Sequence, residues 1–192
     1  MHHFFAYMAR MKLIRRWSLM KSVSEENIAE HSAQVAQIAH ALALIKNRYF
    51  GGSINADRVT TLALYHETSE VLTGDLPTPI KYYNPEIRKA YKDIEGVANE
   101  KLLGMLPDGL REDYRPLVMG DESAYEQRLV KAADKISAYV KCVEELRSGN
   151  REFVKAEATL RTEVERLCEM EEVRYFCDTF MDTFRKTLDE LD

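Results

Sequence analysis

The sequence contains few residues that interrupt or cross-link a chain: its 192 residues include eight glycines, five prolines and three cysteines. So few glycines and prolines argue against a fold made of many tight turns. An odd number of cysteines without a Cys-x-x-Cys spacing argues against a disulfide framework and against a cysteine zinc site. Long apolar runs are also missing, because no stretch approaches the roughly 18 uninterrupted residues of a membrane span.

A strong charge of one sign is absent too. The formal net charge is −5, which disfavours a broad nucleic-acid-binding surface but is compatible with a small anionic substrate. The N-terminal region does not have the pattern of a signal peptide, since basic residues between Arg10 and Arg16 interrupt its apolar residues. We therefore expect a cytoplasmic protein that binds neither a membrane nor a nucleic-acid polymer.

Apolar residues recur at helical spacing along the chain, and no segment shows the alternation of a half-buried strand. This pattern predicts one all-α domain over residues 1–192. Helix-capping and helix-breaking residues place the predicted helices at about 4–19, 27–50, 56–74, 84–106, 123–148 and 152–188. A stiff proline-containing loop is expected at 75–79 and an irregular connector at 107–122, because each residue before a proline favours extended geometry.

Two histidines and three acids stand out within the predicted helices. His31 and His66 each share a helix face with apolar residues. Either one alone is more often a hydrogen-bonded core histidine than a ligand. However, Glu67 follows His66 directly and Glu70 lies one turn beyond it. Asp134 stands in an apolar stripe, where an aspartate is disfavoured unless a partner compensates it.

A divalent cation would compensate His31, His66, Glu67 and Asp134 together. Such mixed nitrogen and oxygen donors suit Mn²⁺, Co²⁺, Fe²⁺ or Zn²⁺. The competing interpretation is a buried Asp134 paired with a neighbouring lysine, Lys131 or Lys135. Other templates do not match the sequence: there is no His-Glu-x-x-His, no Glu-x-x-His, no GxxxxGK[ST] and no GxSxG.

Several segments together resemble one known family, the bacterial 5′-deoxynucleotidases of the HD-domain phosphohydrolases. The segments that carry the resemblance are His3-Phe-Phe-Ala, Leu13-Ile-Arg-Arg-Trp17, Glu30-His31-Ser32, Ala63-Leu-Tyr-His66, Ser69-Glu-Val-Leu-Thr-Gly-Asp-Leu-Pro-Thr-Pro79 and Lys131-Ala-Ala-Asp134. They span nearly the whole chain. The run from Ser69 to Pro79, joined to the Arg-Trp pair, is the most specific of them.

The resemblance implies an HD-domain helical bundle that hydrolyses deoxyribonucleoside 5′-monophosphates to deoxynucleoside and phosphate. It implies one divalent ion, of Co, Mn, Zn, Fe or Mg, held by His31, His66, Glu67 and Asp134. It also implies a homodimer. The catalytic residues expected from the resemblance are Arg16, Glu70 and Asp75. The residues expected to bind substrate are Arg16, Trp17, His31, Glu67, Asp75, Leu76, Pro77, Thr78 and Asp134.

These residues suggest individual roles. Arg16 suits the phosphate oxygens, because a guanidinium can bind them bidentately. Glu70 and Asp75 are candidates for the acid and the base, and the sequence does not assign which is which. Trp17, the only tryptophan, is expected beside the sugar or base. By resemblance, Trp17 and the wall formed by residues 75–78 leave no room for a 2′-hydroxyl group.

The chain departs from the family pattern at one position. The family has His-Asp where this sequence has His66-Glu67, which places the carboxylate one methylene further from the backbone. Two alternatives therefore stay open: a catalytically weakened protein that binds a nucleotide or metal, and an HD phosphohydrolase for another nucleotide. Val71 argues against an alarmone hydrolase, which resembles His-Asp-x-x-Glu-Asp here.

Overall fold

The computed structural model describes residues 1–81, 83–121 and 123–191, without the side chain of Thr78. Every regular element in these residues is a helix, and the one extended pairing is an isolated antiparallel bridge between Arg15 and Asn27. The prediction of an all-α fold is confirmed. No helix in the described residues is long and apolar enough to cross a membrane.

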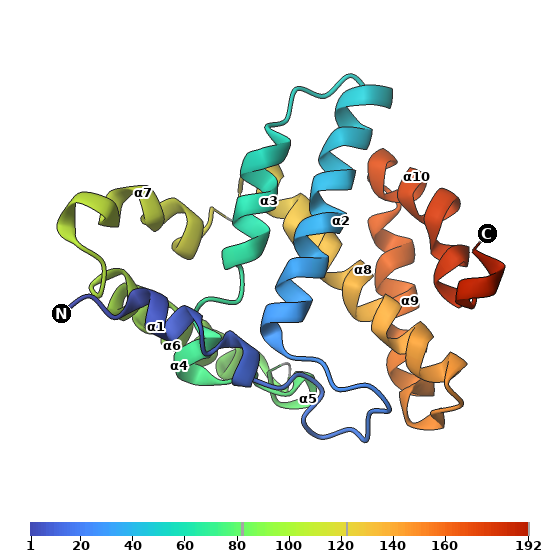
Figure 1. Ribbon diagram of the computed structural model, residues 1–192, viewed down its shortest axis with the longest axis horizontal. Helices are drawn as coiled ribbons and strands as arrows, with labels where there is room; N and C mark the ends of the chain where they lie inside the picture. Colours follow the sequence, from blue (N-terminus) through green and yellow to red (C-terminus); the bar gives the residue numbers. More distant parts are fainter. Residues whose placement is uncertain (82, 122, 192) are drawn as a thin grey trace.

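Most helices follow one another with short connections, and a long loop over residues 14–27 leads into α2 (Figure 1). In chain order they are α1 (Phe4–Met8), η1 (Met11–Leu13), α2 (Ile28–Tyr49), α3 (Ala56–Tyr65), α4 (Glu70–Thr73), α5 (Thr78–Lys81), α6 (Pro85–Leu103), α7 (Asp108–Met119), α8 (Tyr125–Arg147), η2 (Arg151–Phe153), α9 (Val154–Leu167), α10 (Glu171–Phe180), η3 (Met181–Arg185) and η4 (Leu188–Glu190).

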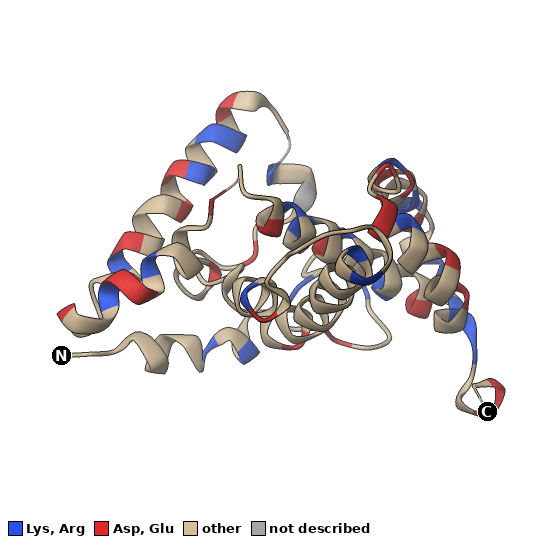
Figure 2. Cartoon of the chain, turned by 90° about the horizontal axis from the view of Figure 1, so that it is seen from above, with Lys and Arg blue, Asp and Glu red and all other residues tan. Residues whose placement is uncertain are grey.

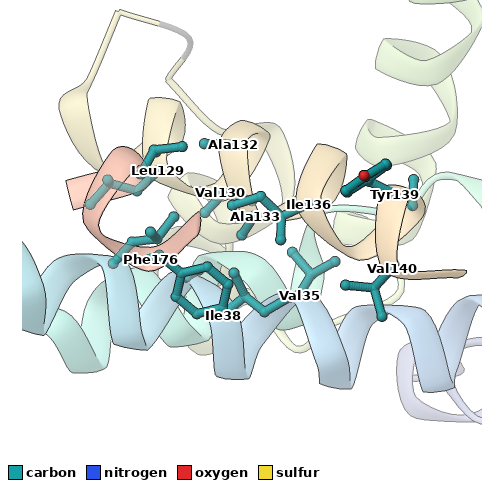
Figure 3. Packing of buried hydrophobic residues seen from close by; sticks show 14 of the residues in the cluster. Val35, Ile38, Leu129, Val130, Ala132, Ala133, Ile136, Tyr139, Val140 and Phe176 are labelled. Carbon is teal, nitrogen blue, oxygen red and sulfur yellow. The ribbon is translucent and has the colours of Figure 1, made fainter. Parts of the chain in front are cut away.

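The main core lies where α2, α3 and α8 pack together. Figure 3 shows Val35 and Ile38 of α2 facing Val130 and Ile136 of α8, with Phe176 of α10 beside them. All five side chains are buried, and burial of each contributes about 1.5–3 kcal/mol to stability. Helices α9 and α10 cover one side of this core (Figure 1). The core therefore holds α2 and α8 rigidly side by side.

A second apolar cluster joins α1, α6 and α7 on the other side of the central helices (Figure 1). Phe4 is 1% exposed and packs edge-on against Tyr114 of α7, with ring centroids 5.3 Å apart. Ile28, the first residue of α2, belongs to the same cluster and its N–H donates to the carbonyl oxygen of Ile14. The N-terminal segment is thereby fixed against the start of α2.

Three predicted helix starts are confirmed because they rest on local capping. The side chain of Asn27 accepts from the N–H of Ala29 and of Glu30, and forms a capping box with Glu30. Asn55 and Asn84 cap α3 and α6 by accepting from the N–H of Arg58 and of Ile87. The predicted helix start at 123 is wrong, since Ser123 bonds to Asp121 and Ala124 precedes α8 without a side-chain cap.

The predicted helix over residues 4–19 is also wrong. Helix α1 ends at Met8, η1 ends at Leu13, and the chain then pairs back on itself, with the N–H of Arg16 donating to the carbonyl oxygen of Glu26. Trp17 has φ of 57°, which no right-handed helix accommodates. Tertiary pairing across ten residues therefore overrides a helical pattern.

Three further boundaries differ from the predictions. The predicted connector 107–122 contains helix α7, which includes Pro116 and is held by the rings of Tyr114 and Phe4. The predicted helix 152–188 breaks after Leu167 into α9 and α10. Thr78 begins helix α5 rather than continuing a loop, because a proline at the second helical position loses no intrahelical hydrogen bond.

Charged residues are mixed over the helices. Figure 2 shows lysines and arginines interspersed with aspartates and glutamates rather than gathered on a single face. The distribution agrees with the modest net charge and does not form one broad basic surface in this view.

Candidate active site

Four side chains from three separate segments meet at the junction of α2, α3 and α8. Each of His31, His66, Glu67 and Asp134 offers a ligand atom, and these atoms all lie within 4.8 Å of one another. His31 comes from the first turn of α2 and Asp134 from the middle of α8. The structure thus brings together all four residues that the sequence predicts as metal ligands.

The α-helical hydrogen bonding ends where two of these residues stand, and bonds over three residues replace it. The predicted helix 56–74 is wrong, because α3 ends at Tyr65 and His66 is its C-cap. The Nδ1 of His66 lies 2.6 Å from the carbonyl oxygen of Ala63. A carbonyl can only accept, so Nδ1 carries the proton and Nε2 is left to face the cluster. That Nε2 is buried without a hydrogen-bond partner.

A similar arrangement fixes His31, which is fully buried. Ser137 donates its hydroxyl proton to the Oε1 of Gln34 over 2.6 Å and lies 3.2 Å from the Nδ1 of His31. Because its proton goes to Gln34, the hydroxyl accepts from Nδ1–H of His31. The Nε2 of His31 then faces the Oδ1 of Asp134 at 3.0 Å.

These tautomers test whether the residues fit a metal ion. Each Nε2 carries a lone pair aimed at a carboxylate oxygen: His31 at Asp134 over 3.0 Å, and His66 at Glu67 over 3.3 Å. Two acceptors facing each other repel unless a positive charge lies between them. Two imidazole nitrogens and two carboxylates form a donor set that suits a divalent ion. The residues therefore fit the predicted ion.

The pKa shifts of His66 and Asp134 also indicate a site that favours positive charge. Burial would lower the pKa of His66, but the carboxylates of Glu67 and Asp134 outweigh burial and raise it. Burial would raise the pKa of Asp134, but His31 and Arg16 hold it well below its usual range. The cluster thus favours positive charge at its centre and ionised carboxylates around it.

Ser137 is the residue to change if the tautomer of His31 matters. Replacing Ser137 by alanine removes the acceptor of Nδ1–H, and we expect metal affinity to fall by about 10- to 100-fold. Isothermal titration of the metal-stripped protein with Zn²⁺ or Co²⁺ measures the change. Ser148→Ala, at the exposed end of the same helix, is the control. Equal affinities of the two variants would exclude an orienting role for Ser137.

Arg16 lies beside the ligand cluster with a side chain that is only 12% exposed. Its Nη1 is 3.7 Å from the Oε1 of Glu67, and its Nε donates to the Oε2 of Glu26 over 3.1 Å. Burial would lower the pKa of Arg16, but Asp134, Glu67, Glu26 and Asp75 raise it. A permanent cation is therefore held against the cluster, as the sequence predicts.

Glu70 and Asp75 both interact electrostatically with Glu67 and Arg16. Glu70 is 2% exposed, and its Oε2 has no hydrogen-bond partner among the described residues. Burial and the neighbouring charge of Glu67 raise the pKa of Glu70 to about 11. Asp75 is half-buried, and burial raises its pKa while Arg16 opposes the rise. The two predicted acid/base residues therefore lie within reach of the same charges and differ in burial.

The remaining predicted site residues make fewer described contacts with the ligand cluster. Leu76 and Pro77 are half-buried in the segment between α4 and α5, where the carbonyl oxygen of Pro77 accepts from two N–H groups of α5. The described interactions link neither side chain to the ligand cluster. The side chain of Thr78 lies outside the described part of the structure. Trp17 packs against Phe153 with ring centroids 5.3 Å apart.

A cavity of about 540 Å³ opens beside Asp134. Helices α6, α8 and α9 contribute most of its wall. The basic and aromatic residues that line it are Lys81, Arg88, Tyr91, Lys92, Lys131, Lys135 and Arg166. Cations outnumber the acids Glu95, Asp134 and Glu163 in this wall, so the cavity offers an anion an electrostatically favourable approach to the cluster.

Two residues of this region escaped the sequence analysis. Ser137 follows Asp134 by one helical turn, and only the fold shows that its hydroxyl meets His31. Glu26 precedes the cap residue Asn27 and resembles an ordinary acidic residue before a helix. Its side chain nevertheless accepts from both Arg16 and Trp17, a contact that no periodicity indicates.

The sequence is similar to a described protein family over most of its length. A family model described as 5′-deoxynucleotidase YfbR-like matches residues 3–184. The 5′-deoxynucleotidase VV1113 of Vibrio vulnificus is 59% identical over 191 residues, covering 98% of this chain and 97% of the relative. The 5′-deoxynucleotidase YfbR of Escherichia coli is 52% identical over 192 residues, covering 98% and 95%.

Solved structures share the fold. An HD-domain phosphohydrolase of Listeria innocua superposes with a TM-score of 0.80 at 25% identity, covering 95% of this chain and 88% of that one. The cyanophage S-2L HD phosphohydrolase DatZ, bound to dA and one catalytic Zn²⁺ ion, superposes with a TM-score of 0.63 at 20% identity, covering 95% of this chain and 96% of that one. The all-α bundle is therefore the HD-domain fold.

Proposed function

The chain belongs to the YfbR-like 5′-deoxynucleotidase family, and on that premise we propose how its residues hydrolyse a deoxyribonucleoside 5′-monophosphate. It is a phosphoric monoester hydrolase that releases deoxynucleoside and phosphate. The observation that carries the residue assignment is the pair of histidine Nε2 atoms, each facing a carboxylate, beside the buried cation Arg16.

His31, His66, Glu67 and Asp134 would hold one divalent ion. When bound, such an ion lowers the pKa of a water ligand and neutralises charge on the phosphate. Ser137 and the carbonyl of Ala63 keep both imidazoles in the ligating tautomer.

Arg16 binds the phosphate oxygens in this proposal. Its Nε is engaged by Glu26, so its Nη edge remains directed at the cluster, where Nη1 lies 3.7 Å from Glu67. A guanidinium held in one orientation can donate two parallel hydrogen bonds to a phosphate. Because phosphoryl transfer depends on positioning and charge neutralisation, Arg16 stabilises the transition state as well as the bound substrate.

We divide the proton transfers between Glu70 and Asp75 by their burial and charge. Water attacks phosphorus in line and gives up a proton, the bond from phosphorus to the 5′ oxygen breaks, and that oxygen takes up a proton. The charge of Glu67 helps to raise the pKa of the buried Glu70 to about 11. A divalent ion held by Glu67 would offset that charge and lower this pKa, so we assign Glu70 to accept the proton of the attacking water. Asp75 is half-buried and burial raises its pKa, so we assign it to donate a proton to the leaving 5′ oxygen.

The proposal is tested by phosphate release from dAMP and AMP after metal stripping, with Co²⁺, Mn²⁺, Zn²⁺, Fe²⁺ or Mg²⁺ added in turn. We expect release that requires a metal and is at least about 10-fold faster with dAMP, because one unfavourable contact with a 2′-hydroxyl is worth about 1–3 kcal/mol. Equal rates on both nucleotides, or no release with any metal, would contradict the proposal.

A second candidate function is favoured by one contact. The carboxylate of Glu67 reaches both Arg16 and Glu70, and so occupies groups that the reaction needs. A weakened enzyme would bind dAMP without turnover. Calorimetric binding of dAMP beside the release assay separates this candidate from an active enzyme.

Three finer expectations accompany the activity. A divalent ion chosen from Co, Mn, Zn, Fe and Mg, a homodimer and a cytoplasmic location remain predictions from the sequence. Light scattering coupled to size-exclusion chromatography tests the dimer, and metal analysis of protein purified without added metal tests the ion.

A further inference from the structure

One carboxylate joins the two residues of the Arg-Trp pair. The Oε2 of Glu26 accepts from Nε of Arg16 over 3.1 Å and from Nε1 of Trp17 over 2.9 Å. Arg16 and Glu26 are each 12% exposed, so solvent screens this pair little. The other oxygen of Glu26, Oε1, lies 3.9 Å from Nδ1 of His31, which is too far for a hydrogen bond.

The contact determines which edge of Arg16 is available. With Nε held by Glu26, the guanidinium presents its Nη groups towards Glu67 and the ligand cluster. Without that hydrogen bond, rotation about the side-chain bonds of Arg16 would let its guanidinium group adopt several orientations. A fixed fork loses less conformational entropy when it binds phosphate.

Trp17 needs the same anchor for a different reason. It is the only non-glycine residue with positive φ among the described residues, at 57°. This backbone conformation is unfavourable for a bulky side chain and persists only when its surroundings enforce it. The enforcing contacts are the hydrogen bond to Glu26 and the packing of the indole against Phe153.

The loop that carries these residues is fastened at its far end. The N–H groups of Val23 and Ser24 donate to the carboxylate of Glu145, and Lys141 bonds both Glu145 and the carbonyl of Ser24. Glu145 and Lys141 are buried. The side chain of Glu26 takes no part in this fastening. Replacing that side chain therefore acts on the groups that it faces, which are Arg16 and Trp17 through hydrogen bonds and His31 at 3.9 Å.

We propose that Glu26 is a positioning residue that holds Arg16 and Trp17 in one arrangement, and so couples phosphate binding to rejection of a 2′-hydroxyl. The inference rests on the roles proposed for Arg16 and Trp17. One anion sets both the phosphate-binding edge and the orientation of the indole. Loss of the Glu26 carboxylate should weaken both the affinity for the nucleotide and the discrimination against a 2′-hydroxyl. A change in only one of the two would indicate that Glu26 positions only one of the two side chains.

The test is Glu26→Ala, with kcat and KM measured on dAMP and AMP. We expect KM for dAMP to rise about 10- to 100-fold, because charge-assisted hydrogen bonds are lost. The preference for dAMP over AMP should fall by about 10-fold. Glu26→Gln keeps a carbonyl acceptor for both donors and should restore most of the discrimination. Trp17 is the only tryptophan, so its fluorescence reports directly on indole mobility, and quenching by acrylamide should increase in Glu26→Ala.

The neighbouring pair supplies a matched control. Glu25 accepts from Arg15 over 2.8 Å, but both side chains are more than 65% exposed, at 67% and 69%, and such pairs contribute little. Glu25→Ala should leave KM, discrimination and fluorescence unchanged. Trp17→Phe keeps an aromatic ring, although a smaller one, and removes the N–H donor to Glu26. Its effect on discrimination should therefore overlap with that of Glu26→Ala instead of adding to it in full.

Each result has one meaning. Unchanged discrimination in Glu26→Ala, beside damaged Arg16→Ala and Trp17→Phe variants, overturns the inference about Glu26 alone. Arg16→Ala and Trp17→Phe that both behave as the parent protein overturn the roles assigned under the proposed function. If Glu26→Ala does not fold, Glu26→Gln and Trp17→Phe decide. A Glu26→Gln protein that loses discrimination as completely as Trp17→Phe, although the acceptor for both donors is kept, counts against the proposal.

Discussion

Replacing Asp134 by alanine is expected to lower metal-dependent phosphate release by about 10³-fold or more. Asp134 lies 3.0 Å from Nε2 of His31 and supplies one of the two carboxylates of the cluster. Charge stabilisation by a catalytic ion amounts to several kcal/mol, and a loss of about 4 kcal/mol corresponds to about 10³ in rate. Phosphate release from dAMP at saturating Co²⁺ or Mn²⁺ measures the loss.

Thermal unfolding separates a lost ligand from a damaged fold. An ion at 100 times its dissociation constant stabilises the native protein by about 2.7 kcal/mol, which for a chain of this size raises Tm by about 5–10 °C. Asp134→Ala should unfold cooperatively without metal yet lose this rise. Glu163→Gln lines the same cavity and pairs only with Lys135 in the described contacts, and should keep both the rise and the activity. A full metal-induced rise in Asp134→Ala would remove Asp134 from the ligand set.

Helix starts were predictable from sequence where they depend on neighbouring residues. Asn27, Asn55 and Asn84 each cap a helix through bonds to N–H groups two or three residues ahead, and this chemistry is visible in the sequence. Helix α7 was missed because Gly109 and Pro116 are typical helix breakers. The packing of α7 on α1, which is far away in sequence, and on the preceding helix α6 outweighs the low helix propensity of these two residues.

The predicted metal ligands could be recognised in the sequence because they are polar residues at positions where apolar residues are expected. His31 and Asp134 are polar residues in apolar stripes, which is costly unless a partner compensates them. Their meeting point was also affected by an error in the predicted secondary structure. The chain turns at His66, and it is this turn, with Nδ1 of His66 bonded to Ala63, that aims Nε2 into the cluster.

Residues that position other side chains could not be recognised in the sequence in this way. Glu26 and Ser137 are common polar residues in unremarkable positions, and their partners are ten and 106 residues away. A hydrogen bond between distant segments depends on the packing of whole helices, which a residue pattern does not specify. The cavity wall beside Asp134 could not be predicted for the same reason, since it is assembled from α6, α8 and α9.

Glu67→Asp is expected to accelerate dAMP hydrolysis by about 10- to 100-fold, because displacements on the order of 1 Å alter rates by up to about 10². The longer side chain of Glu67 reaches beyond the ligand cluster: its carboxylate lies 3.7 Å from Nη1 of Arg16, and its charge raises the pKa of Glu70. Shortening it by one methylene would withdraw the negative charge from both residues, leaving Arg16 for the phosphate and Glu70 for the water.

The direction of this effect distinguishes two origins of the His-Glu pair. A faster Glu67→Asp protein, with KM for dAMP lowered because Arg16 is released, would show that Glu67 restrains an otherwise complete site. A slower one would show that the surrounding residues have repacked around the longer side chain, which a buried site does only through several coordinated changes. Measuring both proteins with each metal adds a second criterion. If Glu67 has changed the coordination geometry rather than the contacts of Arg16, the substitution should alter the order of metal preference while leaving KM for dAMP nearly constant.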